Sequence, residues 1–366
     1  MRVVRVETAE CKLPLPRPIR LGPVEIRTRD FVVLRLTADD GTTGDALAYP
    51  RGGPLLEATA RMAHGVVGKD ADMRRATVDG FLQNHVNNRA GYVKAASLFD
   101  IALWDLAAKR AGLPLHRMLG AVRTSVPVMV VAGYYLDQRT VADVCREVGE
   151  LCDAGYQRIK IMILGNDPAF DEKLVRSALA IAGDRLCVDA HWAFRSVPEA
   201  LHTLRRLDGL GLRFVEDPFG PFQATLYPEL QAAMRTPLGS GEDLSDPHDL
   251  FALSRSISVL RVDATTCGGI TAAQSVVEAA SLSGRSVLPH VFLPVHAQLA
   301  GAHRAIDAAE YIPVESGACP MFDLLEGKPD IEGGTLRIDQ RPGAGFTLDW
   351  AAVERYAATR GETVEA

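Results

Sequence analysis

The sequence lacks the features that mark several large classes of protein. No apolar stretch in its 366 residues is long enough to span a bilayer, so we do not expect an integral membrane protein. It has no CxxC motif and no disulfide-framework spacing, although it contains six cysteines. In a chain of this length, scattered cysteines indicate buried thiols in a reducing compartment. These residues are Cys11, Cys145, Cys152, Cys187, Cys267 and Cys319.

An excess of basic charge is also missing. Lys and Arg number 40 against 46 Asp and Glu, which gives a formal net charge of -6. Nucleic acids and anionic membranes both require clustered basic surface, so we expect neither as a partner. The start of the chain, Met1 to Glu7, alternates like a strand and contains no signal-peptide core. We therefore expect a cytoplasmic protein.

The composition is that of an ordinary soluble enzyme, 47% hydrophobic and 23% charged. The chain exceeds the usual single domain, so we expect one large and one smaller domain.

Residues 1–40 show strand-like alternation and end in the hairpin signal Asp39-Asp40-Gly41. Strands followed by helices predict an N-terminal α+β domain over residues 1–122. The helical periodicity covers 54–65, 70–84 and 90–111.

From about residue 124 the pattern changes to short β-type runs that alternate with helical stretches. Eight such runs predict a (β/α)-barrel, which we place over residues 123–325. A doubly wound sheet is the alternative, but no Gly-rich dinucleotide-binding turn is evident. We expect the turn-rich tail, 326–366, to pack back on the N-terminal domain. The eight runs are Val126–Ala132, Arg158–Met162, Leu186–Asp189, Leu212–Glu216, Pro237–Glu242, Ser258–Asp263, Ser286–His290 and Ala309–Tyr311.

Three successive runs end in a carboxylate, namely Asp189, Glu216 and Glu242. In a barrel of this kind the carboxyl ends of the strands form the active site, so these side chains should converge on one face. Carboxylate oxygens on three rigid strand ends suit a hard divalent cation with octahedral oxygen coordination, which favours Mg²⁺ over Zn²⁺. We therefore predict a metal site formed by these three residues.

Polar residues also end the neighbouring strands. Asp263 ends the sixth run and His290 ends the seventh. On adjacent parallel strands, Asp263 would accept a hydrogen bond from one imidazole nitrogen of His290 and leave the other nitrogen for proton transfer. Lys160, in the second run, would either orient a substrate carboxylate or act with a lowered pKa beside the cation.

Taken together, these strand ends resemble the mandelate racemase/muconate-lactonizing subgroup of the enolase superfamily. The segment Ala95–Gly120 (AASLFDIALWDLAAKRAGLPLHRMLG) is similar to the linker-helix signature of that subgroup. The resemblance implies a TIM-like barrel of β7α type with an N-terminal α+β capping domain that the C-terminal tail completes. It also implies roles for the residues that match: the metal ligands Asp189, Glu216 and Glu242, the acid/base dyad Asp263 and His290, and Glu310 on the enolate side of the intermediate.

The chemistry that the resemblance implies is abstraction of the proton α to a carboxylate, which gives an enediolate stabilised by Mg²⁺. The second strand departs from the subgroup, which usually carries Lys-x-Lys there. This chain reads Lys160-Ile161-Met162, and methionine cannot accept a proton. His290 would then be the dominant acid/base. His191 stands where the subgroup more often has Asn, and it would either act on the face that Met162 leaves without a base or bind the substrate.

Substrate selection in this subgroup depends on cap loops that close over the barrel mouth, here Pro14–Arg29 and Tyr49–Leu55. Their polar and basic residues favour a polyhydroxylated or dianionic acid over an aryl acid. Barrel enzymes of this kind often form dimers or octamers, so we expect a homo-oligomer. The expected substrate contacts are Arg17, Tyr49, Lys160, His191 and Glu310, with Arg20, Arg51 and His296 as further candidates at the mouth.

Three functions follow from these residues. The favoured one is a Mg²⁺-dependent lyase that dehydrates an acid sugar to a 2-keto-3-deoxy acid, with His290 and Asp263 as acid/base. The second is an isomerase of the same superfamily, either an epimerase or a sugar-lactone cycloisomerase, in which Lys160 or His191 assists His290. The third is a non-catalytic binding or regulatory protein, which is disfavoured because a dead site has no chemical need for Asp263 behind His290.

Overall fold

The computed structural model describes residues 1–21, 24–85, 87 and 89–366. Its N-terminal part contains an antiparallel sheet in which β1 (Val3–Leu21), β2 (Val24–Ala38) and β3 (Thr43–Ala48) pair in order. The predicted turn joins β2 to β3. Gly41 has a φ of +82° there, a conformation that favours glycine, and the Asp40 carboxylate accepts a hydrogen bond of 2.9 Å from a backbone N–H in the turn.

The expected loop Pro14–Arg29 has a different structure. In its described part it consists of the facing ends of β1 and β2, which pair at Ile19 with Ile26 and at Pro14 with Thr28. Alternating β-branched and charged residues in this stretch favour an extended strand. The two described strands of this segment therefore pair as antiparallel arms over the barrel mouth, and residues 22–23 between them lie outside the described residues.

Helices of the cap cover one side of this sheet, and α3 lies against β3. The approach is close because a Cβ atom on Gly44 would lie 2.0 Å from the carbonyl oxygen of Ala102. The buried Asp105 carboxylate of α3 accepts hydrogen bonds from the backbone N–H groups of Asp45 (2.9 Å) and Ala344 (2.7 Å), which joins helix, sheet and C-terminal segment. The cap helices are α1 (Leu55–Val66), α2 (Arg74–Asn84), α3 (Arg89–Ala111) and α4 (Leu115–Met118).

The predicted barrel is confirmed. Neighbouring strands from β4 to β10 pair in parallel in chain order, and β11 pairs with β4. A bridge joins Val287 of β10 to Ile306, which precedes β11, so the sheet closes on itself. The strands are β4 (Ser125–Ala132), β5 (Arg158–Met162), β6 (Leu186–Asp189), β7 (Val215–Glu216), β8 (Leu238–Ser240), β9 (Val259–Val262), β10 (Ser286–Pro289) and β11 (Ala309–Tyr311).

Several barrel helices begin at capping residues. The side chains of Thr140, Asp167, Ser196 and Asp246 each accept a hydrogen bond from a backbone N–H in the first turn. After β11 the chain forms short 3₁₀ turns in place of a further α-helix. Within the described ranges, no helix is both long and apolar enough to cross a membrane. The barrel helices are α5 (Val141–Asp153), α6 (Pro168–Ala182), α7 (Val197–Leu204), α8 (Tyr227–Ala232), α9 (Pro247–Ser254), α10 (Gly269–Leu282) and α11 (Leu293–Ala302).

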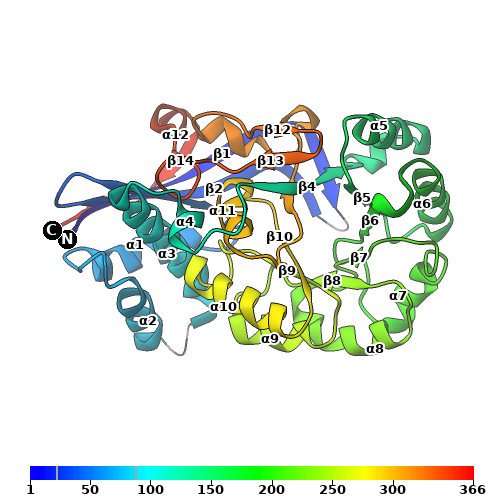
Figure 1. Cartoon of the computed structure of the whole chain (residues 1–366), viewed down its shortest axis with the longest axis horizontal. Helices are drawn as coiled ribbons and strands as arrows, with labels where there is room; N and C mark the ends of the chain where they lie inside the picture. The colour runs from blue at the N-terminus through cyan, green and yellow to red at the C-terminus, as the bar shows by residue number, and fades with distance from the viewer. Residues whose placement is uncertain (22–23, 86, 88) are drawn as a thin grey trace.

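The C-terminal segment returns to the cap. β14 and β15 both pair antiparallel with β1, so the two ends of the chain lie together at the cap side of the molecule (Figure 1). The hairpin before them pairs with β4 at the edge of the barrel. These elements are β12 (Ile331–Glu332), β13 (Thr335–Arg337), α12 (Trp350–Tyr356), β14 (Ala357–Arg360) and β15 (Val364–Glu365).

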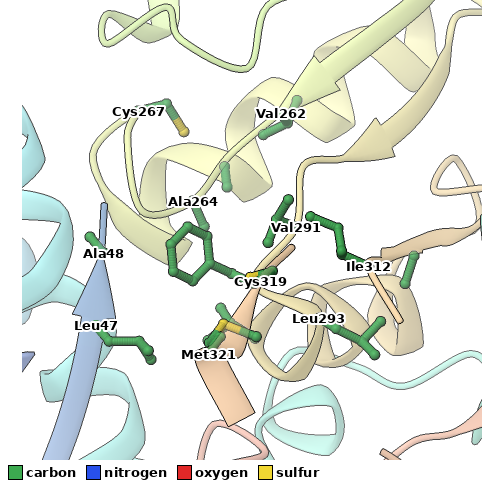
Figure 2. Close-up of a cluster of buried hydrophobic side chains, with 14 of the residues drawn as sticks. Leu47, Ala48, Val262, Ala264, Cys267, Val291, Leu293, Ile312, Cys319 and Met321 are labelled. Atoms are coloured by element: carbon green, nitrogen blue, oxygen red, sulfur yellow. The ribbon is translucent and has the colours of Figure 1, made fainter. Parts of the chain in front are cut away.

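A buried apolar cluster joins the cap to the barrel. Figure 2 shows Leu47 and Ala48 of β3 in one buried cluster with barrel residues that include Val262, Val291 and Ile312. Val262 ends β9, Val291 is two residues beyond the end of β10, and Ile312 follows β11 directly. The cap therefore lies over the carboxyl ends of the barrel strands, where the predicted site residues stand.

Candidate active site

Buried carboxylates surround Lys160 at the carboxyl ends of the strands. Its Nζ atom lies 2.6 Å from Glu310 Oε1, 2.7 Å from Glu216 Oε1 and 3.2 Å from Asp189 Oδ2. These partners stand on β11, β7 and β6, so one lysine on β5 connects four strands of the barrel. The predicted strand-end residues thus converge, with Lys160 between Asp189 and Glu216.

The carboxylates also determine the charge of Lys160. Burial alone would lower its pKa, but Glu216, Glu310 and Asp189 hold the pKa well above its ordinary value. Among these carboxylates, the pKa of Lys160 is therefore raised and not lowered, unlike the second possibility considered from the sequence. An ammonium group at this position suits the orientation of a substrate carboxylate.

A second buried cation, Arg261, was not predicted. It stands on β9 and is completely buried. Its Nε lies 3.2 Å from Glu216 Oε1, one terminal nitrogen lies 3.5 Å from Glu242 Oε2, and the same nitrogen pairs with Glu310. The other terminal nitrogen donates to two backbone carbonyls of β10, at 3.1 and 3.3 Å. The sequence did contain a signal for this residue. An arginine inside the apolar run Val259–Val262 is expected to be buried, and a buried charge requires partners of opposite charge.

Two carboxylate oxygens in this cluster have no hydrogen-bond partner within the described part of the chain. They are Oε2 of Glu216 and Oε2 of Glu242, and both are buried. Oxygens of Glu216, Asp217 and Glu242 lie within 4.8 Å of one another. Burial raises the pKa of Glu216 well above its ordinary value despite Arg261 and Lys160, so its anionic form requires further positive charge. A set of carboxylate oxygens fits a hard divalent cation.

Asp189 and Asp217 flank these two glutamates. Asp189 Oδ1 accepts a 2.9 Å hydrogen bond from the backbone N–H of His191, which leaves Oδ2 toward Lys160. Asp217 Oδ1 accepts a 2.5 Å hydrogen bond from the Ser240 hydroxyl, and burial raises the pKa of Asp217 well above its ordinary value. Asp217 follows Glu216 directly at the same strand end, and it is a further acidic residue of the site to which the sequence analysis gave no role.

The predicted pair of His290 and Asp263 is present across the ends of β10 and β9. Nδ1 of His290 lies 2.9 Å from Asp263 Oδ2, while Nε2 lies 3.4 Å from Glu242 Oε1. Burial raises the pKa of Asp263, but the hydrogen bond to His290 and other contacts hold it below its ordinary value. An anionic Asp263 accepts a hydrogen bond from the Nδ1–H group and leaves Nε2 for proton transfer at the mouth.

The Asp263 carboxylate is itself held in place. Its Oδ1 accepts hydrogen bonds of 2.7 Å from both the backbone N–H and the hydroxyl of Thr265. Behind it, His296 accepts from the backbone N–H of Ala264 through Nε2 (3.0 Å) and contacts the Val291 carbonyl through Nδ1 (2.8 Å). His296 was a candidate for the mouth, but it is completely buried and supports the loop after β9.

His191 and Met162 line the opposite side of the same cavity. The strands β6 and β10 are four positions apart in an eight-stranded ring, so His191 and His290 face each other across the mouth. His191 has a φ of +41°, and its ring stacks on Trp192 with centroids 4.6 Å apart. Burial lowers the pKa of His191, so its imidazole is neutral near pH 7.

The cavity between cap and barrel has a volume of about 480 Å³. Tyr49 and Arg51 of the cap line it, as expected. Arg17 does not, because its guanidinium lies over the ring of Tyr135 with its central carbon 4.1 Å from the centroid. Arg20 lines a smaller neighbouring cavity of about 160 Å³. The structure therefore does not bring Arg17 to the site, and the hairpin contributes Arg29 there.

Arg51 reaches from the cap into the barrel mouth. One terminal nitrogen lies 3.3 Å from His290 Nε2, and the other lies 3.2 Å from Asp243 Oδ2. Its backbone has a φ of +48°, a left-handed conformation that is uncommon for arginine. Tyr49 beside it contacts Cys319 through its hydroxyl at 3.0 Å. The cap thus places a positive charge directly beside the imidazole.

Comparison with known families agrees with this geometry. A family model described as "Enolase C-terminal domain-like" matches residues 143–352. A second, described as "Mandelate racemase / muconate lactonizing enzyme, N-terminal domain", matches residues 3–120. The chain belongs to this family. The family assignment made from the strand ends is confirmed, and so is the capped barrel of the enolase superfamily.

Members of the mandelate racemase/muconate lactonizing enzyme family that resemble this chain differ in reaction. The L-talarate/galactarate dehydratase of Salmonella typhimurium is 28% identical over 95% of this chain and 89% of the relative. The L-Lys-D/L-Arg epimerase of Methylococcus capsulatus is 27% identical over 94% of this chain and 99% of the relative. The similarity therefore includes both a lyase and an isomerase.

A solved structure of the family agrees with the predicted cofactor. L-talarate dehydratase from Polaromonas sp. JS666, complexed with Mg and L-glucarate, matches with a TM-score of 0.86 at 25% identity. The match covers 100% of this chain and 99% of that one. The prediction of Mg²⁺ from the carboxylates of this chain is consistent with that structure.

Proposed function

We propose that this protein is a Mg²⁺-dependent acid-sugar dehydratase. The observation that carries the proposal is the arrangement of His290, whose Nδ1 contacts Asp263 at 2.9 Å and whose Nε2 faces the mouth beside Glu242. A base oriented in this way suits removal of a weakly acidic proton next to a carboxylate. The similarity to L-talarate/galactarate dehydratase supports the same reaction class.

The reaction would use one acid/base group twice. Nε2 of His290 takes the proton from the carbon α to the substrate carboxylate, and the electrons of that C–H bond move into the carboxylate to form an enediolate. The imidazolium, stabilised by Asp263, then gives the proton to the β-hydroxyl, which leaves as water when the C–O bond breaks. The resulting enol tautomerises to a 2-keto-3-deoxy acid. Loss of one water balances the reaction.

The carboxylates around Lys160 would hold the cation and the reacting end of the substrate. Asp189, Glu216 and Glu242 are the proposed ligands, and a bound Mg²⁺ supplies positive charge that stabilises the enediolate. The Lys160 ammonium would orient the substrate carboxylate. Glu310, which pairs with Lys160 at 2.6 Å, would keep that ammonium on the enolate side.

A second candidate function is an epimerase of the same family. It is favoured by His191, which faces His290 across the cavity and would return a proton to the opposite side of the substrate carbon. The similarity to L-Lys-D/L-Arg epimerase agrees with that alternative. A sugar-lactone cycloisomerase would use the same pair. Met162 argues against these reactions because it removes the second base that the family usually carries on this strand.

A panel of acid sugars, incubated with the protein and Mg²⁺, would separate the candidates. Semicarbazide detects the 2-keto product of dehydration, and proton NMR in D₂O detects exchange of the α-proton. We expect a 2-keto product from at least one acid sugar. Exchange with inversion and without a keto product would instead identify an epimerase. If neither keto product nor exchange occurs with any acid tested, the proposed function is wrong.

A further inference from the structure

Arg29 on the cap hairpin presents a positive charge to the cavity. It stands on β2 and lines the cavity together with Tyr49 and Tyr134. Its Nε donates a 2.9 Å hydrogen bond to the backbone carbonyl of Ala318, which fixes the direction of the guanidinium. Among residues 1–21, 24–85, 87 and 89–366, no carboxylate oxygen lies within 4.0 Å of it. Its terminal nitrogens are therefore available to a ligand.

Other charges on the cap side of the cavity have partners. Glu25 lies 2.6 Å from Arg27 and 3.1 Å from Arg20, and Asp30 accepts a 2.6 Å hydrogen bond from a threonine hydroxyl. Arg51 lies 3.2 Å from Asp243. Among the described arginines that line the cap side of the cavity, Arg27 and Arg51 therefore pair with carboxylates and Arg29 does not. A guanidinium binds a carboxylate through two parallel hydrogen bonds, which makes a carboxylate the suitable ligand.

The surroundings of Arg29 favour such a contact. Tyr49 lies between the two cap arginines, with the guanidinium carbons of Arg29 and Arg51 each 5.9 Å from its ring centroid. Burial raises the pKa of Tyr49 well above its ordinary value and that of Tyr134 likewise, so both phenols stay neutral and leave the charge of Arg29 uncompensated. In a partly enclosed cavity, a contact between opposite charges is screened less than in water.

We propose that Arg29 binds the second carboxylate of a diacid, which makes the substrate an aldarate, with a carboxylate at each end, and not an aldonate. The inference rests on the proposed function, because the first carboxylate is taken to bind at Lys160 and the metal ligands on the barrel floor. Arg29 stands on the cap above that floor. A cavity of about 480 Å³ is of the size that holds small organic ligands, so a six-carbon chain would reach from the floor to the cap.

The test compares diacids with monoacids of the same chain length. The probes are galactarate and D-glucarate against D-galactonate and D-gluconate, all with Mg²⁺. Wild type is compared with Arg29→Met, which keeps an unbranched apolar side chain but removes the guanidinium and its charge. It is also compared with Arg29→Lys, which keeps the charge but loses the two parallel donors of the guanidinium. Arg61→Met on the exposed face of α1 is the matched control. Readouts are kcat and KM, and quenching of tryptophan fluorescence, since Trp192 lines the cavity.

We expect wild type to prefer a diacid. Arg29→Met should lower kcat/KM for that diacid by about 10- to 100-fold, mainly through KM, and change the value for monoacids by less than about threefold. Arg29→Lys should recover part of the loss, and Arg61→Met should behave as wild type. A merely structural role of Arg29 would instead lower kcat/KM equally for both kinds of acid, and that result would overturn the inference.

Other outcomes separate this inference from the proposed function. If wild type turns over monoacids as well as diacids, the inference fails while the dehydratase stands. If no acid is turned over but a diacid still quenches the fluorescence in a manner that depends on Arg29, diacid binding stands and the proposed reaction fails. If no diacid binds to wild type, the inference is overturned.

Discussion

The two walls of the cavity hold their charges in different ways. On the barrel wall, Lys160 and Arg261 stand on strands, are 3% and 0% exposed, and contact several carboxylates each. On the cap wall, charged residues stand on a hairpin and a turn, and Arg27 is 75% exposed. Arg29 donates only to a backbone carbonyl among the contacts of the described residues. The barrel wall therefore pairs its cations with its own carboxylates and has carboxylate oxygens left for a metal, whereas the cap has the cation Arg29 left for a ligand.

This difference predicts which changes are costly. Removing one partner from a buried ion pair leaves an uncompensated charge and costs about 3–5 kcal/mol, while an exposed pair contributes about 0–1 kcal/mol. Changes on the barrel wall should therefore affect metal binding, catalysis and stability together. A change at Arg29 on the cap wall should affect substrate affinity alone, because its guanidinium donates only to a backbone carbonyl among the described contacts.

The largest expected effect is that of Glu216→Gln. This glutamate contacts Lys160 at 2.7 Å and Arg261 at 3.2 Å, and its other oxygen is a proposed metal ligand. We expect no detectable turnover, Mg²⁺ affinity reduced by at least roughly 100-fold, and a lower free energy of unfolding. Calorimetric titration with Mg²⁺ and chemical denaturation measure these changes. Chelation of the metal by EDTA should likewise abolish turnover in wild type.

The control for that change is Glu229→Gln, at an exposed position on α8. It removes the same charge far from the cavity and should leave Mg²⁺ affinity and turnover unchanged. If Glu216→Gln binds Mg²⁺ as tightly as wild type, Glu216 is not a ligand and the metal site lies elsewhere.

The next effect in size is the loss of the acid/base group. His290→Asn should lower kcat by about 10³-fold with little change in Mg²⁺ affinity, because a positioned acid/base contributes about 10² to 10⁴ in rate. Asp263→Asn should cost less, since it leaves the imidazole in place but no longer fixes its tautomer. The exposed His202→Asn serves as the control. Unchanged turnover and α-proton exchange in His290→Asn would show that another residue is the base.

The contrast between the walls also explains what could be predicted from the sequence. Strand-end residues such as Asp189 and Glu216 follow a short apolar run, and parallel strands necessarily bring their ends together. That local pattern was sufficient to predict the barrel, the convergence of the strand-end carboxylates and the contact of His290 with Asp263. Arg261 was missed because it stands inside an apolar run and not at its end. A charge at such a buried position did indicate that carboxylate partners lie nearby.

The cap residues were harder to predict because their position depends on contacts between distant parts of the chain. Arg17 and Arg29 both lie in the segment that was expected to be a loop. They stand on the two paired strands and have different surroundings. Arg17 lies over the ring of Tyr135, while Arg29 donates to the backbone carbonyl of Ala318 and lines the cavity. No periodicity in the segment distinguishes them, because the difference arises only when the hairpin packs on the barrel.

A smaller effect is expected from Met162→Lys, which restores the base that the family usually carries on this strand. Met162 is 4% exposed and lines the cavity on the side of His191. A lysine there would stand opposite His290 and near Asp189, so we expect exchange of the α-proton in D₂O to rise on the order of tenfold, with inversion at that carbon. NMR of the recovered acid measures both. Met162→Leu, which adds no base, is the control. Equal α-proton exchange in the two variants would show that the absence of a base at position 162 does not limit the reaction.

The smallest effect on turnover is expected from Leu47→Ala, at the apolar contact between cap and barrel. Leu47 is 3% exposed, and its truncation should lower the free energy of unfolding by about 2–5 kcal/mol. Leu47→Ala should change kcat by only a few-fold, because the charged residues of the barrel wall keep their positions through contacts with one another. Leu282→Ala, at a position 91% exposed, should change stability by less than about 0.5 kcal/mol. Urea denaturation and steady-state kinetics of the two variants test this. If Leu47→Ala lowers kcat as much as His290→Asn does, the barrel wall depends on the cap for its geometry, and the two walls are not separate in function.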